Sequence, residues 1–144
     1  GADFAIDTNP EGWRDRLKAI GKPNIVVDPL CGPLFESAFR SLAWNGRHLV
    51  IGFVGGDIPA LPVNLTLMKG ASLTGVDVRQ YLLYENENAQ KDFKDLAAWS
   101  EQGLLKPSVG QKFEFNAFRD ALKMALSGKV LGKVVLGIGE GSSN

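Results

Sequence analysis

Uniformly apolar stretches alternate along the chain with stretches in which apolar residues recur every three or four positions. The uniform stretches are typical of strands in a parallel sheet covered on both faces. The three- to four-residue spacing is typical of helices that bury one side. The expected strands are residues 4–7, 24–28, 47–53, 72–78, 112–115 and 133–138, and the expected helices are about 10–20, 33–43, 64–68, 87–102 and 116–127. This alternation predicts an α/β fold with a mostly parallel sheet.

Glycine-containing turns follow two of the expected buried strands. Residues 28–32 read Asp-Pro-Leu-Cys-Gly, and residues 52–56 read Gly-Phe-Val-Gly-Gly. Parallel α/β sheets bind ligands beyond the carboxyl ends of their strands, where glycine lets backbone approach a ligand closely. Tight strand-to-helix turns without a ligand would have the same composition. Both interpretations stay open from the residues alone.

Composition and charge exclude several classes of function. Sixteen Lys and Arg balance sixteen Asp and Glu, so the formal net charge is zero. A general nucleic-acid binder would carry a basic surface instead. No apolar run approaches the ~20 residues of a membrane span, and no signal peptide opens the sequence. We expect a soluble, cytoplasmic protein with neither nucleic acid nor membrane as partner.

The chain holds one histidine and one cysteine, too few for a zinc centre built on thiolates and imidazoles. His48 lies within an expected strand, where a packed and hydrogen-bonded role is the simplest interpretation. Cys31 follows a strand end, but no activating base is visible nearby in the sequence, so we expect a structural role. We therefore expect no metal ligand and no catalytic side chain in these residues.

Four segments resemble the zinc-independent quinone oxidoreductases of the medium-chain dehydrogenase/reductase superfamily. They read GADFAID, DPLCG, WNGRHLVIGFVGGDIPALPVNLTLMKGASLTGV and SGKVLGKVVL. The resemblance runs in order from residue 1 to about residue 138. It implies an enzyme that passes hydride from NADPH directly to a quinone or another enone, with no metal.

The resemblance also assigns cofactor-binding positions. Thr8 falls beside the adenosine phosphate, although the family usually has an aromatic residue or histidine there. Leu30 and Gly32 fall on the turn beside the cofactor, where Cys31 replaces the second glycine of the usual pair. Lys133 matches a basic residue aimed at the pyrophosphate.

Two further turns are implied to hold the nicotinamide end of NADPH. The first is the family's turn that holds the nicotinamide ring, and the second is the end of a strand whose main chain faces the carboxamide of that ring. The matching residues are Gly52, Phe53, Val54 and Gly55 in the first, and Val76, Asp77 and Val78 in the second. Residues 78–81 replace the family's usual aromatic-glycine step, so the substrate class is the weakest implication.

The glycine-rich turn that binds the pyrophosphate does not occur before the second expected strand. By the resemblance, the sequence starts at the third strand of the Rossmann domain. We therefore expect a partial Rossmann-like, mostly parallel sheet from the third strand onward. Residues 1–108 would belong to the dinucleotide-binding domain. Residues 109–144 would be the returning segment of the catalytic domain, with a tail.

The strand order 3-2-1-4-5-6 leaves residues 4–7 without a neighbour and opens one edge of strand 24–28. The covering segment could be absent from this sequence, residues 4–7 could pair directly with residues 24–28, or another copy could cover the edge. The resemblance also implies a homodimer that pairs the strand Ser72–Val78 with its twofold mate.

Three functional interpretations follow. The first is a fragment of an NADPH:quinone reductase that is inactive alone. The second is a non-catalytic association module derived from such a reductase. The third is an enoyl-thioester reductase of the same superfamily.

Overall fold

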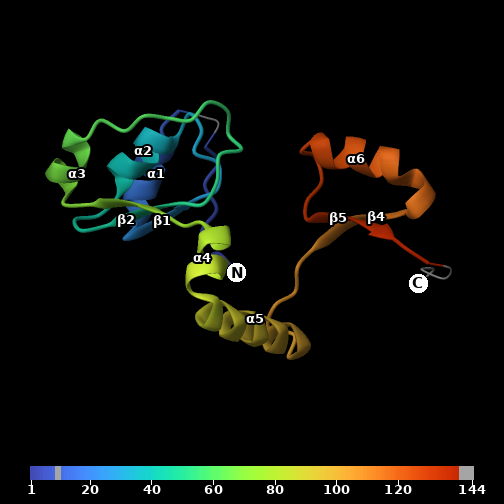
Figure 1. The fold of residues 1–144 in the computed structure, drawn as a ribbon. Helices are drawn as coiled ribbons and strands as arrows, with labels where there is room; N and C mark the ends of the chain where they lie inside the picture. The colour runs from blue at the N-terminus through green and yellow to red at the C-terminus, as the bar shows by residue number, and fades with distance from the viewer. Residues whose placement is uncertain (9–10, 140–144) are drawn as a thin grey trace. The chain divides into compact units, whose positions relative to one another are not determined.

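The computed structural model describes residues 1–8 and 11–139. The chain divides into two compact units, Gly1–Tyr84 and a second that begins at Glu85 (Figure 1). Each unit is described separately below. The expected division between residues 108 and 109 concerns the domains of a complete enzyme and stays a prediction.

The first unit is built on a parallel sheet of three strands. They are β1 (Ile25–Asp28), β2 (Arg47–Val50) and β3 (Ser72–Gly75), in the order β1-β2-β3. The register aligns Asp28 with Val50 and Val50 with Gly75. All three strands therefore end at the same edge of the sheet, which is where an α/β sheet receives ligands.

Four helices accompany this sheet: α1 (Trp13–Ile20), α2 (Phe35–Ser41), α3 (Asn64–Lys69) and α4 (Val78–Tyr84). α2 packs on β1, and α1 packs on α2. The core is a small apolar cluster supplied by α2, α3 and the segments beside them, namely Phe39, Leu42, Leu65 and Ala71, with Val26 and Leu61 against it.

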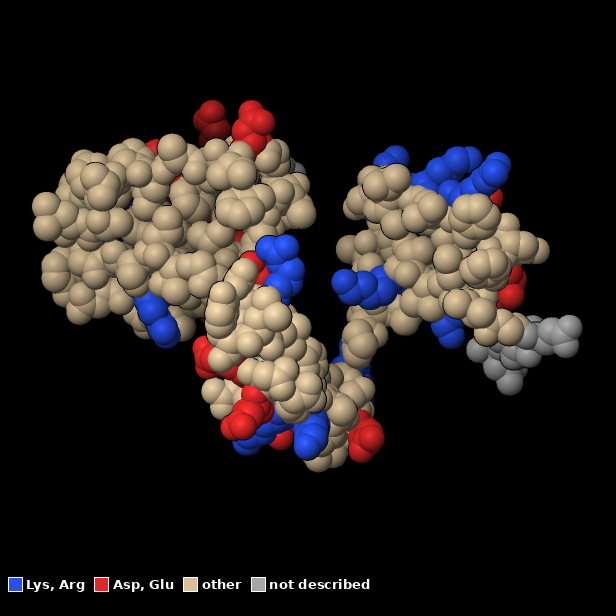
Figure 2. Space-filling model, viewed as in Figure 1, with Lys and Arg blue, Asp and Glu red and all other residues tan. Residues whose placement is uncertain are grey.

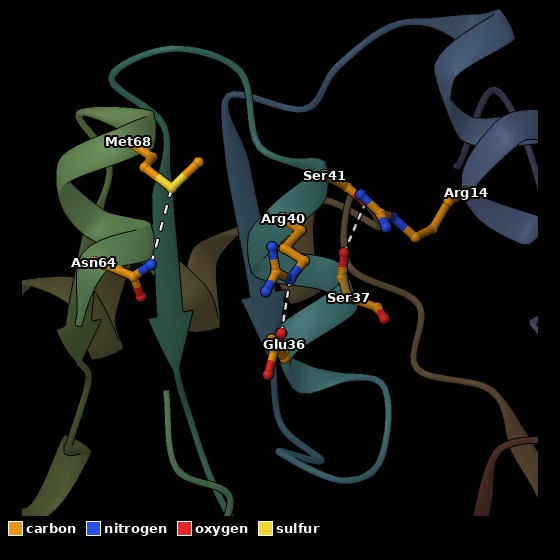
Figure 3. Close-up of polar contacts among 7 residues, drawn as sticks. All are labelled: Arg14, Glu36, Ser37, Arg40, Ser41, Asn64 and Met68. Carbon is orange, nitrogen blue, oxygen red and sulfur yellow. Dashed lines mark hydrogen bonds and ion pairs between the residues drawn. The ribbon is translucent and has the colours of Figure 1, made fainter. Parts of the chain in front are cut away.

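Polar contacts fasten α1 and α3 to the end of α2. Arg14 Nε donates to Ser41 Oγ at 3.3 Å, and that hydroxyl donates to the Ser37 carbonyl at 2.8 Å (Figure 3). Lys69 Nζ donates to the Leu42 carbonyl at 2.8 Å. Positive charge beside a helix carboxyl end is favourable, because the last carbonyl groups carry partial negative charge.

The sheet has one covered face, which corrects the expectation of burial on both. Side chains alternate along a strand, and Val26 and Asp28 are the less exposed residues of β1. Val27 points the other way and is 63% exposed. Figure 2 shows a largely uncharged surface on the face of the first unit turned to the viewer.

Several expected strands differ from the structure. The strand expected over 47–53 ends at Val50, and the one expected over 112–115 spans Val109–Glu114. Residues 4–7, within the described range 1–8, form no strand, so the expected strand is wrong and the alternative that pairs it with residues 24–28 is excluded. A strand needs a neighbour for its backbone groups, and the sequence offers none here. The strand expected over 72–78 ends at Gly75, and helix α4 begins at Val78.

The second unit places a helix on a pair of parallel strands. Its elements are α5 (Asn86–Glu101), β4 (Val109–Glu114), a 3-10 turn (Phe115–Ala117), α6 (Phe118–Leu126) and β5 (Lys133–Gly137). β4 pairs with β5, with an irregularity between Val109 and Gln111, and α6 packs against both. The parallel α/β prediction is therefore confirmed in both units.

Asn9 and Pro10 of the expected first helix, and residues 140–144 of the expected tail, lie outside the described residues. Among the helices that the structure describes, none is long and apolar enough to cross a bilayer.

Candidate functional site

The turns that follow β1 and β2 pack backbone against backbone at Gly32 and Gly55. The Gly55 N–H donates to the Leu30 carbonyl at 2.8 Å. A Cβ atom built on Gly55 would lie 2.7 Å from Gly32 Cα, and one built on Gly32 would lie 2.8 Å from the Gly55 carbonyl oxygen. Real Cβ atoms do not tolerate such contacts, so both positions require glycine. The contact between the two turns is enough to explain these two glycines.

Asp28 organises the turn after β1. Its Oδ1 accepts the N–H groups of Leu30 at 3.0 Å and Cys31 at 2.8 Å. Aspartate commonly satisfies the backbone of the two or three residues that follow it in this way. The main-chain carbonyl of Asp28 also accepts the Ile51 N–H at 3.0 Å, so this residue joins the ends of β1 and β2.

His48 holds the other oxygen of the same carboxylate. Its Nε2 lies 3.1 Å from Asp28 Oδ2, and the carboxylate can only accept, so Nε2 carries the proton of this bond. The imidazole ring is fully buried. Its centroid lies 4.8 Å from the ring centroid of Phe35 and 6.0 Å from that of Phe39. Nδ1 is buried without a hydrogen-bond partner in the described part of the chain. An unpaired buried polar atom costs about 1–3 kcal/mol.

The carboxyl of Asp28 ionises readily although its side chain is only 13% exposed. Burial alone would raise the pKa of this carboxyl. The N–H groups of Cys31 and Leu30, together with His48, outweigh burial and hold its pKa below the usual value. The turn is therefore built around a half-buried carboxylate with three donors.

Cys31 has a structural role here, as the sequence predicts. It is 1% exposed and adopts φ 45°, in the left-handed region that favours glycine. Its thiol points inward, 3.7 Å from the Asp28 carbonyl oxygen, so it does not cover the open side of the turn. Burial and the neighbouring Asp28 raise the pKa of the thiol, which keeps it protonated.

Two cavities open at the carboxyl ends of the strands. The first, of about 380 Å³, is lined by four residues that the sequence assigns to the cofactor, Thr8, Leu30, Gly32 and Gly55. The second, of about 510 Å³, is lined by five others, Gly52, Phe53, Val76, Asp77 and Val78. Val54 lies outside both linings and is 77% exposed. The predicted positions of the first unit thus divide between two neighbouring hollows.

Backbone at the second cavity is less closely packed than the Gly32 and Gly55 backbone at the first. A Cβ built on Gly75 at the end of β3 would meet nothing within 4 Å. The rim beyond it carries an ion pair, in which Arg79 Nη2 lies 2.9 Å from Asp77 Oδ2. Hydrogen bonding from Arg79 lowers the pKa of Asp77. Val76 and Asp77 lie between β3 and α4, which corrects their predicted place within a strand.

Lys133 is the first residue of β5 and belongs to the second unit. Its N–H donates to the Ser108 carbonyl at 2.8 Å. Its predicted role at the pyrophosphate stays a prediction, separate from the geometry of the first unit.

The contact between Asp28 and His48 was not anticipated from the sequence. In the parallel register His48 lies beside Val26, two residues before Asp28, so both side chains point to the face that α2 covers. An aspartate closing an apolar strand and a histidine inside the next strand are the signal that could have predicted it. Metal binding has no comparable support, because nowhere in residues 1–8 and 11–139 do three His, Cys, Asp or Glu side chains gather to hold an ion.

Comparison with known proteins identifies relatives over almost the whole chain. A family model described as zinc-binding dehydrogenase matches residues 1–136. Quinone oxidoreductase-like protein 2 of Mus musculus is 33% identical over 141 residues, covering 96% of this chain and 40% of that protein. The chain spans about 40% of the length of the curated relatives that it matches first.

Solved structures share the fold. The quinone oxidoreductase of Thermus thermophilus, solved also in complex with NADPH, superposes with a TM-score of 0.71 at 27% identity, covering 86% of this chain and 40% of that one. An NAD-dependent alcohol dehydrogenase superposes with a TM-score of 0.79 at 25% identity, covering 96% of this chain and 39% of that one.

Proposed function

The chain belongs to the zinc-binding dehydrogenase family, within the medium-chain dehydrogenase/reductase superfamily, and we propose that it is the carboxyl-terminal part of an NADPH-dependent reductase of quinones or related enones. One observation carries the proposal. The ends of β1, β2 and β3 lie in register at one edge of the sheet, and the predicted cofactor positions of the first unit line the hollows there, except for the exposed Val54.

The second cavity fits the nicotinamide end of a dinucleotide. Gly75 leaves main chain open toward the hollow, and Phe53 and Val76 give it apolar walls. A flat, weakly polar ring next to exposed backbone donors is the kind of ligand that such a lining accepts. Gly32 and Gly55 would act indirectly, by fixing the turns that carry Leu30 and Phe53.

When bound, NADPH would supply hydride to the substrate, and this part of the chain would place and shield it. Leu30 and Phe53 would exclude water from the cofactor. Lys133 would face the pyrophosphate as a compensating charge, and Thr8 would lie near the adenosine phosphate. The substrate lobe and the glycine-rich phosphate turn would come from the remainder of the protein.

Other features of the proposal concern the whole protein. Residues 1–108 would belong to the nucleotide domain and residues 109–144 to the catalytic domain. Two copies would pair through the edge Ser72–Val78. The complete enzyme would be cytoplasmic and would need no metal, and residues 1–144 alone would be inactive.

The substrate class can be tested by steady-state oxidation of NADPH by the complete protein. We expect turnover with a quinone or an enone, a preference for NADPH over NADH, and no loss after dialysis against a metal chelator. Faster turnover of a 2-enoyl thioester would favour the enoyl-thioester alternative. Saturating cofactor without turnover of any acceptor would favour the association module.

The site can be tested separately with Gly75→Val. The new side chain has room in the strand but would occupy the second cavity. We expect unchanged unfolding and at least a tenfold weaker affinity for NADPH, measured by cofactor fluorescence. Ser72→Val adds volume on the same strand outside the cavity and is the matched control. Equal affinity in Gly75→Val and wild type would contradict this placement of the cofactor.

A further inference from the structure

We propose that His48 is a positioning residue for the cofactor site, holding the Asp28 carboxylate so that the turns after β1 and β2 keep their shape. The inference rests on the proposed function, because it assigns a purpose to the turn that carries Leu30. It goes beyond that function by identifying a buried residue, itself in neither cavity lining, on which the site depends.

Packing alone does not account for a histidine at this position. The ring is fully buried beside Phe35 and Phe39, where an aliphatic side chain would make similar contacts. Histidine instead leaves Nδ1 without a partner in the described residues. What the ring contributes beyond apolar contact is the Nε2 proton, which Asp28 Oδ2 accepts at 3.1 Å.

That bond fixes the orientation of the carboxylate. With Oδ2 held by His48, Oδ1 faces the N–H groups of Leu30 and Cys31 at 3.0 and 2.8 Å. Rotation of the carboxylate would break both bonds, because the two oxygens have different partners. His48 therefore acts on the turn through Asp28.

The position of the turn over residues 28–32 in turn determines the position of the turn over residues 52–56. The Leu30 carbonyl accepts the Gly55 N–H at 2.8 Å, and Gly55 lies directly against Gly32. A small displacement of residues 30–32 must therefore move residue 55 as well, since neither glycine has free space. One buried histidine thus sets the positions of two turns that line the candidate site.

The proposal can be tested with His48→Leu and His48→Gln in the complete protein. Leucine keeps apolar volume and removes the donor, whereas glutamine supplies an amide donor of similar reach. Leu65→Ala is the matched control, because Leu65 belongs to the buried cluster of Phe39, which stacks on His48, and lies in α3 rather than in either turn. The readouts are NADPH affinity, the KM and kcat of turnover, and hydrogen exchange of the Leu30, Cys31 and Gly55 amides.

We expect His48→Leu to speed exchange at these three amides and to raise the KM for NADPH about tenfold, as for one lost bond to a charged group, with kcat changed less than twofold. His48→Gln should restore both, and Leu65→Ala should lower stability without moving either. Unchanged exchange in His48→Leu, or equal effects of His48→Leu and Leu65→Ala, would overturn the proposal.

Failure of the proposed function gives a different pattern. If the wild-type protein does not bind NADPH, yet His48→Leu still speeds exchange at the three amides and His48→Gln restores it, the positioning role stands and the cofactor assignment fails. If His48→Leu does not fold, Asp28→Asn provides the second test. Asparagine presents an amide N–H to the Nε2–H of His48, so the bond that orients the side chain at position 28 is lost. We expect faster exchange at the three amides, and near-native exchange would overturn the proposal.

Discussion

The turns at the two ends of the candidate site are held by different kinds of interaction. The turn after β1 is anchored by a half-buried carboxylate with three donors and by direct contact between Gly32 and Gly55. The segment after β3 is anchored by an ion pair between Asp77 and Arg79 that lies open to solvent. The first arrangement excludes alternative conformations, whereas the second is screened by salt and water.

This difference indicates which part of the site is formed in advance. Close backbone contacts resist deformation, so the turns of residues 28–32 and 52–55 should keep their shape with or without a ligand. The segment that follows begins beside open space, since a Cβ built on Gly75 would meet nothing within 4 Å. Adaptation to different substrates is therefore expected there rather than at the first turn.

The largest expected effect is that of Gly55→Ala. The new methyl group would lie 2.7 Å from Gly32 Cα, so one of the two turns must move. We expect a loss of about 3 kcal/mol in the free energy of unfolding, as for overpacked sites, measured by urea denaturation. Gly75→Ala is the matched control, with no loss expected. Similar midpoints for the two variants would show that the turns are not closely packed.

A smaller loss is expected for Asp28→Ala. The change removes the acceptor of two N–H groups and leaves the buried Nε2–H of His48 unpaired. We expect a loss of about 2 kcal/mol in the free energy of unfolding. A variant as stable as wild type would show that the Asp28 carboxylate does not hold the turn.

The same carboxylate predicts a dependence on pH. Its pKa in the folded protein lies below the unfolded value, so its stabilising contribution is complete above the unfolded pKa and is lost as the pH falls through the folded pKa. From about pH 4 downward, wild type should lose more stability than Asp28→Asn. Parallel acid curves of the urea midpoint for the two proteins would contradict this origin.

The smallest effect is expected for Arg79→Ala. The ion pair with Asp77 is exposed, and such pairs contribute little to stability. We expect an unchanged urea midpoint at both low and high salt. A clear destabilisation that disappears in high salt would show that the segment after β3 is held more firmly than its exposure indicates.

The sequence predicted the elements whose signals are local. Apolar runs located β1 and β2, and glycine and proline located the turns that follow them. It also anticipated that residues 4–7 lack a neighbour, although it still assigned them a strand. Strand formation depends on a partner, which a run of apolar residues does not reveal.

The sequence predicted which residues line the candidate site but not the contacts that hold its turns in place. Resemblance supplied the positions, and the cavities gather most of those in the first unit. The pairing of Asp28 with His48 depends on strand register, and the contact of Gly32 with Gly55 depends on how two turns meet. Neither is encoded in spacing along the chain, since 20 residues separate Asp28 from His48.

Hydrogen exchange of the complete protein, measured with and without NADPH, tests the central claim most directly. We predict that NADPH slows exchange in peptides that cover residues 28–32, 52–55 and 76–78 and leaves peptides of α3 unchanged. Protection elsewhere with none in these three segments would contradict the assignment of the cofactor to this edge of the sheet.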